Sequence, residues 1–143
     1  MTVDSNQQEL NIGQIITMWL KDNPQGAPEA KVMTMILAEL SNPGVQTKQI
    51  GNTVFEIIKG EGPNAFFKAF NVDTPQNFVE NGRKFVVYAR RMLGLQHLVT
   101  VFTDPSLEHI FKIISGNPPM PGMGYQVHHT PDGKIQIELN LGA

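Results

Sequence analysis

The basic side chains of one predicted helix are the first residues whose types and spacing could do chemistry. The helix begins at Thr74-Pro75 and ends before Gly94. At about 100° per residue, four basic residues fall within roughly a third of its circumference, opposite its apolar side chains. Such a surface could bind phosphates or an acidic protein partner. This basic stripe consists of Arg83, Lys84, Arg90 and Arg91.

A solvated helix face is the favoured interpretation of the basic stripe. Its arginines lie near the C-terminal end of the helix, where the helix dipole stabilises positive charge. No aromatic side chain lies within the stripe to stack on bases, and the chain has a formal net charge of −2. Such a chain has no general attraction to nucleic acid or to an anionic membrane. Nucleic acid is therefore the less favoured partner, and no membrane partner is expected.

The histidines are the next candidates, because imidazole can bind metals or act as a general base. His97 and His109 each lie off the apolar stripe of their own segment. His128 and His129 are adjacent in an extended segment, so their side chains point to opposite faces and cannot hold one ion together. The sequence therefore predicts no metal site, and it favours His129 as a partly buried turn residue.

Known catalytic and cofactor-binding motifs are absent. Gly60-Glu61-Gly62 precedes a predicted helix, but a dinucleotide fingerprint needs a third glycine after a strand, and a P-loop needs Gly-Lys-Ser/Thr. The chain has no cysteine, which excludes a thiol nucleophile, a thiolate zinc site and a disulfide framework. Neither Gly-x-Ser-x-Gly nor His-Glu-x-x-His occurs. We therefore predict no catalytic residue and no cofactor. The sequence leans towards a protein that is not an enzyme, and an enzyme with a site not visible in the sequence is the second alternative.

A helix-turn-helix unit within residues 33–70 is a further alternative. Thr47 and Gly51 match the first half of such a motif. Phe55 stands where a turn glycine is expected, and the helix after Pro63 offers few side chains for base recognition. Plain helical packing is therefore favoured over this DNA-binding motif.

Helical spacing of apolar residues dominates the first 116 residues, and proline or glycine separates the periodic segments. Residues 95–103 fit either a helix or a strand, and their helical neighbours favour a helix. We expect a mainly α (α+β) fold with five to seven short amphipathic helices in one layer-pair bundle and a C-terminal β-hairpin. The helices are expected near residues 12–20, 28–40, 47–60, 63–70, 75–93 and 105–115.

The C-terminal part differs in character from the helical domain, residues 1–116. Residues 117–124 form a Pro/Gly-rich linker, and residues 125–143 alternate between apolar and polar side chains around Thr130-Pro131-Asp132-Gly133. This sequence suits a type I turn followed by a left-handed glycine. The resulting register pairs Val127 with Ile137 and places all apolar side chains of the hairpin on one face.

This one-sided apolar face predicts docking, because burial of each large apolar side chain is worth roughly 1.5–3 kcal/mol. The hairpin could cover its own helices or those of a second chain. We expect a non-enzymatic assembly protein that forms a homo-oligomer through this arm. The expected contact residues are Tyr125, Val127, Ile135, Ile137, Leu139 and Leu141.

The sequence also gives an expectation for the location of the protein. Residues 1–10 lack the basic start and the apolar run of a signal peptide. No apolar stretch approaches the roughly 18 residues that a bilayer-spanning helix requires. The sequence therefore predicts a cytoplasmic protein.

Overall fold

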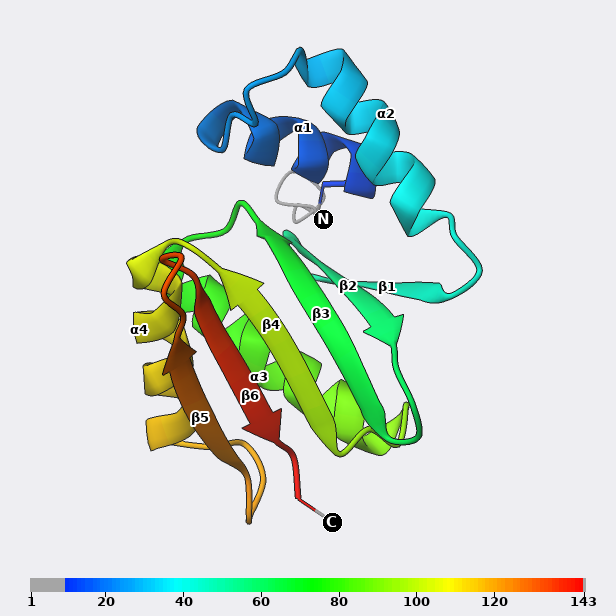
Figure 1. The fold of residues 1–143 in the computed structure, drawn as a ribbon. Helices are drawn as coiled ribbons and strands as arrows, with labels where there is room; N and C mark the ends of the chain where they lie inside the picture. The colour runs from blue at the N-terminus through cyan, green and yellow to red at the C-terminus, as the bar shows by residue number, and fades with distance from the viewer. Residues whose placement is uncertain (1–9, 143) are drawn as a thin grey trace, which may run out of the picture.

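A computed structural model describes residues 10–142 of the chain. It has an α+β fold in which one six-stranded mixed sheet has the strand order β1-β2-β3-β4-β6-β5. Helices α3 and α4 lie behind the sheet, and α1 and α2 lie together near one end of β1–β3 (Figure 1). The elements are α1 (Ile12–Asp22), α2 (Glu29–Leu40), β1 (Val45–Ile50), β2 (Thr53–Lys59), β3 (Asn64–Asn71), α3 (Pro75–Arg91), β4 (His97–Phe102), α4 (Pro105–Gly116), β5 (Gly124–His129) and β6 (Ile135–Asn140).

The expected helical bundle is wrong. Residues 47–60 and 63–70 form β1, β2 and β3 in place of two helices, and residues 95–103 contain strand β4. The spacing of apolar residues does not distinguish a helix from a strand here, because β2 is buried on both faces and every residue from Thr53 to Ile57 is buried. A strand of this kind reads as a continuous apolar run, which periodicity alone does not distinguish from a buried helix. The helix-turn-helix alternative is wrong for the same reason.

The four remaining helices lie where the sequence places them. The Thr74 side chain accepts a hydrogen bond from the amide of Asn77 at 3.2 Å and caps α3. Asp104 accepts one from the amide of Ser106 at 3.0 Å and caps α4. Each cap is followed by a proline, whose missing N–H costs nothing in the first turn of a helix. Local capping chemistry therefore determines these two helix starts.

The register expected for the C-terminal hairpin is confirmed. Strands β5 and β6 are antiparallel, with Tyr125 opposite Leu139 and Val127 opposite Ile137. Strand β6 also pairs with β4 of the same chain, with Thr100 opposite Ile137. The hairpin is therefore a part of the central sheet, and its apolar face contributes to the core of its own chain.

The sheet separates two apolar clusters, since alternate residues of a strand point to opposite faces. Phe55 and Ile57 of β2 belong to the larger cluster beneath α3 and α4. There the rings of Phe55 and Phe85 stack with a centroid distance of 4.1 Å and an interplanar angle of 2°. Val54 of β2 and Phe70 of β3 belong to the second cluster, beneath α1 and α2. Within residues 10–142, no helix combines the length and the apolar character needed to cross a membrane.

The position of β6 in the sheet generates a prediction about stability. Ile137 is 0% exposed and packs in the larger cluster, so Ile137→Ala should lower the free energy of unfolding by about 2–5 kcal/mol. Gln136 precedes it on the other face of the same strand, so Gln136→Ala should change this free energy by about 0.5 kcal/mol at most. Urea unfolding followed by circular dichroism measures both values. Equal midpoints for the two variants would show that the hairpin is a loosely attached arm.

Candidate functional site

The place where the pairing of β3 and β4 ends, which we call the β3–β4 crevice, is the first feature of the fold that could hold a ligand. These two strands are parallel and lie side by side in the middle of the sheet (Figure 1). They pair only from Asn64 opposite His97 to Phe66 opposite Val99, and then separate towards their carboxyl ends. Helices α3 and α4 begin directly after these ends. Ligands of α/β sheets usually bind at such a point, outside the carboxyl ends of parallel strands.

Glu56 of β2 is the most unusual side chain near the crevice. It is 0% exposed, and neither of its carboxylate oxygens has a hydrogen-bond partner among the described residues. The pKa of Glu56 is raised to about 7, chiefly by burial and next by the neighbouring Glu39 carboxylate of α2, while the Lys68 ammonium opposes the rise. Perturbed ionisable groups of this kind are concentrated at functional sites.

Glu39 and Lys68 cover this carboxyl group. The Lys68 Nζ atom lies 3.3 Å from Oε1 of Glu39, and both side chains are partly exposed, at 54% and 38%. Lys68 of β3 is directly opposite Glu56 of β2 in the antiparallel register. A buried acid therefore lies beneath an exposed ion pair, and we call Glu39, Glu56 and Lys68 the carboxylate cluster.

The carboxylate cluster lies at the level where β3 and β4 separate. The last residue of β3 that pairs with β4 is Phe66, and Lys68 is the next residue on the same face. Glu56 is one strand further from the crevice at this level. The arrangement therefore places an acid with a pKa near neutrality next to the floor of the crevice.

The carboxylate cluster is not evident from the sequence. Helical spacing predicts a helix at Glu56, and Glu39 and Lys68 lie far from it in the chain. One signal was present, because Glu56 is the only charged residue in the apolar run from Val54 to Ile58. A charged residue inside a buried strand is costly and therefore indicates a special role.

The structure divides the expected basic stripe. Arg83 donates a hydrogen bond to the carbonyl oxygen of Asn117 and lies 3.7 Å from the carboxylate of Glu80. Arg90 is half-buried, whereas Lys84 and Arg91 are exposed. The four side chains therefore do not form one free basic surface.

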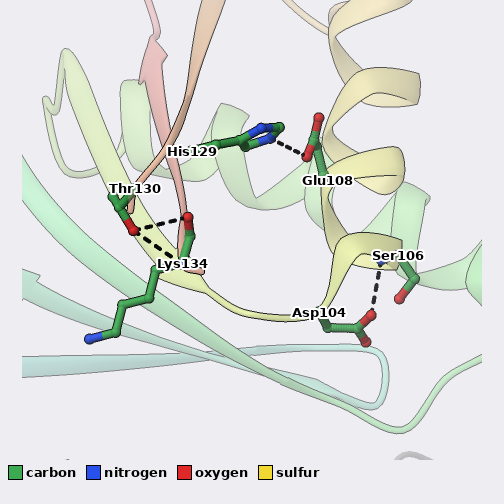
Figure 2. A network of polar contacts seen from close by, with 6 residues as sticks. All are labelled: Asp104, Ser106, Glu108, His129, Thr130 and Lys134. Carbon is green, nitrogen blue, oxygen red and sulfur yellow. Dashed lines mark hydrogen bonds and ion pairs between the residues drawn. The ribbon is translucent and has the colours of Figure 1, made fainter. Parts of the chain in front are cut away.

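The histidines are also dispersed. His129 is exposed, contrary to the expectation, and its Nε2 atom lies 2.8 Å from Glu108 of α4 (Figure 2). His128 contacts Glu138 at 3.0 Å, and His97 contacts Asn64 at 3.0 Å. Residues 10–142 contain no group of three or more His, Asp or Glu side chains that could hold a metal ion. The same figure shows the hydroxyl of Thr130 accepting a hydrogen bond from the amide of Lys134 across the β5–β6 turn. It also shows Asp104 capping α4.

The raised pKa of Glu56 predicts how stability changes with pH. The unfolded chain has the ordinary value of 4.5, and the folded protein has a value of about 7. The folded state therefore holds this proton more tightly, so the contribution of Glu56 to stability is fully present below pH 4.5 and is lost as the pH rises through 7. The loss is about 3 kcal/mol, because one pKa unit corresponds to about 1.4 kcal/mol.

The glutamine of the Glu56→Gln variant cannot ionise. The variant should therefore not lose stability as the pH rises, and it should be more stable than the wild type at pH 8. Thermal unfolding at intervals between pH 5 and pH 8 tests the prediction. Glu61→Gln is the matched control, because Glu61 is exposed in the β2–β3 turn. If the transition temperatures of the wild type and of Glu56→Gln changed with pH in the same way, the raised pKa of Glu56 would be contradicted.

Comparison with known proteins gives similarity in structure only. No protein-family model matches the chain, and no curated protein sequence matches it. A mutant of the spermidine N-acetyltransferase SpeG from Vibrio cholerae has a TM-score of 0.58 at 8% identity, with 94% of each chain covered. The N-acetyltransferase PseH from Campylobacter jejuni, in complex with acetyl coenzyme A, has 0.57 at 12% identity, again with 94% of each chain covered.

A third similar structure is the ribosomal-protein-S18-alanine N-acetyltransferase from Escherichia coli, with a TM-score of 0.55 at 9% identity and 95% of this chain and 93% of that chain covered. These matches overturn the expectation of a non-enzymatic assembly protein, because they span nearly the whole chain and all three are enzymes. The hairpin that was expected to join two copies is two strands of this shared fold. A nucleic-acid module is not favoured either. The chain has the fold of the GNAT N-acetyltransferases.

Proposed function

We propose that this protein is an N-acyltransferase that transfers an acyl group to an amine at the β3–β4 crevice. The observation that carries the proposal is Glu56, a buried carboxyl group with a pKa of about 7 beside the floor of the crevice. The fold supports it, since the similar structures include enzymes named for spermidine and for the alanine of a ribosomal protein as acceptors. The homo-oligomer and the cytoplasmic location expected from the sequence stay predictions beside this proposal.

Proton removal is the task that Glu56 suits. An amine is mostly protonated near neutral pH and must lose a proton before its nitrogen can attack an acyl carbon. A base is most effective when its pKa lies near the working pH, as the pKa of Glu56 does. One ammonium proton passes to Glu56, and the nitrogen–carbon bond forms. The bond between the acyl carbon and the leaving group of the acyl donor then breaks. This leaving group takes the second proton of the nitrogen.

The ion pair above Glu56 provides a way for an amine to enter. Exposed ion pairs contribute only about 0–1 kcal/mol, so Lys68 and Glu39 can separate at little cost. The Lys68 ammonium already lies beside two carboxyl groups, at 3.3 Å from Glu39 and opposite Glu56. A cationic acceptor has the same charge and the same hydrogen-bonding capacity. It can therefore replace Lys68 between Glu39 and Glu56.

The start of α3 does not fit acetyl coenzyme A, the ligand of PseH. A helix N-terminus after a parallel strand is a common diphosphate site, because its free N–H groups face the anion. Here Pro75 has no N–H, and Thr74 accepts from the amide of Asn77. Asp73 adds a negative charge at the same turn. We therefore assign no step of the reaction to this coenzyme.

The proposed role of Glu56 predicts the kinetics of Glu56→Gln. Loss of a general base lowers kcat by about 10²–10⁴-fold, and the rise of the wild-type rate around pH 7 should disappear with it. The assay follows acetylation of spermidine and of an alanine-terminated peptide by S-acetyl-pantetheine and by acetyl coenzyme A. Glu61→Gln should retain the wild-type rate and pH profile. Absence of acyl transfer in all four wild-type reactions would refute the function, and equal rates for the two variants would refute the role of Glu56 as the base.

A further inference from the structure

The carboxylate of Asp73 stabilises the loop between β3 and α3. In a phosphate-binding loop, N–H groups at this position would be offered to a ligand. The Oδ2 atom of Asp73 accepts hydrogen bonds from the amide of Asn52 at 2.9 Å and from Nδ2 of Asn81 at 2.8 Å. Its Oδ1 atom lies 3.5 Å from Nδ2 of Asn52. The donors that converge on this turn are therefore already bound to an anion of the chain itself.

The backbone amides of Val72 and Asp73 are bonded within the chain as well. The amide of Asp73 donates to Oδ1 of Asn71 at 3.1 Å, and the amide of Val72 donates to the carbonyl oxygen of Asn52 at 3.1 Å. The side chain of Asn71 also donates to the carbonyl oxygen of Asp73. A phosphate that used the amide of Asn52, Val72 or Asp73 as a donor would have to break one of these bonds.

Close packing fixes Asp73 in this position. Gly51, in the β1–β2 turn, has a φ of +58°, and a Cβ atom there would lie 2.9 Å from both Oδ2 of Asp73 and Nδ2 of Asn81. Asn81 is 7% exposed and also donates to Thr53 at 3.0 Å. The absence of a side chain at Gly51 therefore leaves room for the hydrogen bonds between Asp73 and Asn81.

The charges on both sides of the crevice also disfavour an anion. Residues 71–82 contain two acidic residues, Asp73 and Glu80, and no lysine or arginine. Across the crevice, residues 99–108 contain Asp104 and Glu108 and again no lysine or arginine. Asp104 uses its carboxylate to cap α4. Phosphate recognition usually relies on basic side chains and free N–H groups, and neither strand end supplies the basic side chains.

Apolar surface lies beside the floor of the crevice. Phe66 of β3 is 54% exposed and Val101 of β4 is 47% exposed, and alternation along the strands places both on the face of the carboxylate cluster. An uncharged ligand arm could cover these two side chains. This part of the crevice therefore suits the neutral portion of a thioester, in contrast to the acidic strand ends.

We infer that the acyl donor is a thioester recognised through a neutral, pantetheine-like arm, without a contribution from a diphosphate. This inference rests on the proposed acyltransferase function and specifies its donor. Two observations carry it: Asp73 at the start of α3 accepts hydrogen bonds from Asn52 and Asn81, and the exposed side chains of Phe66 and Val101 lie earlier along β3 and β4. Removal of the nucleotide portion from the donor should then leave recognition nearly unchanged.

A comparison of two donors tests the inference on the wild-type protein. The values of kcat/KM for S-acetyl-pantetheine and acetyl coenzyme A should agree within about threefold, and pyrophosphate should not inhibit either reaction. A preference of tenfold or more for acetyl coenzyme A, or competition by pyrophosphate, would overturn the inference and leave the acyltransferase function intact. Absence of turnover with both donors would overturn the function and the inference together.

Asp73→Asn supplies a second test of the same point. The variant keeps the size of the side chain and removes one negative charge, so the kcat/KM for acetyl coenzyme A relative to S-acetyl-pantetheine should rise by about threefold as like-charge repulsion decreases. Glu61→Gln, at the other end of β2, should leave the ratio unchanged. Circular dichroism shows whether the Asp73→Asn variant is folded. A folded variant with the wild-type ratio would show that Asp73 does not exclude the diphosphate.

Discussion

The parallel pairing of β3 and β4 is the constraint on which the rest of the structure depends. Two adjacent parallel strands need a crossover connection, and here α3 supplies it and covers the sheet. The pairing ends at Phe66 and Val99, so β4 continues with β6 as its only neighbour over its last residues. The central sheet, the crevice and the place of the hairpin all follow from this one short pairing.

The carboxylate cluster shows how the fold can shift a pKa towards neutrality. A single acidic residue on a strand that is buried on both faces loses its hydration, and only the partly exposed Lys68 offers compensating charge. The energetic cost is tolerable because the rest of β2 contributes fully buried apolar side chains to both clusters. Stability of the core thus supports an unfavourable group at the site.

The β3–α3 loop shows that a shared fold does not transfer a shared ligand. The backbone resembles that of N-acetyltransferases, yet Asp73 and its amide partners form a closed set of hydrogen bonds at the strand end. The same loop connects the β1–β2 turn to α3 through Asn52 and Asn81. Function depends on such side chains, which differ among proteins of one fold.

Features that depend on neighbours in the chain can be predicted from the amino-acid sequence. The caps at Thr74 and Asp104 set two helix starts, and the turn at residues 130–133 set the hairpin register, because each relies on hydrogen bonds within a few residues. Only the tertiary structure decided that residues 45–71 are strands and that the hairpin completes a central sheet. Burial on both faces removes the alternating pattern of a strand, and the partners of Glu56 come from distant segments. No local pattern could therefore reveal the site.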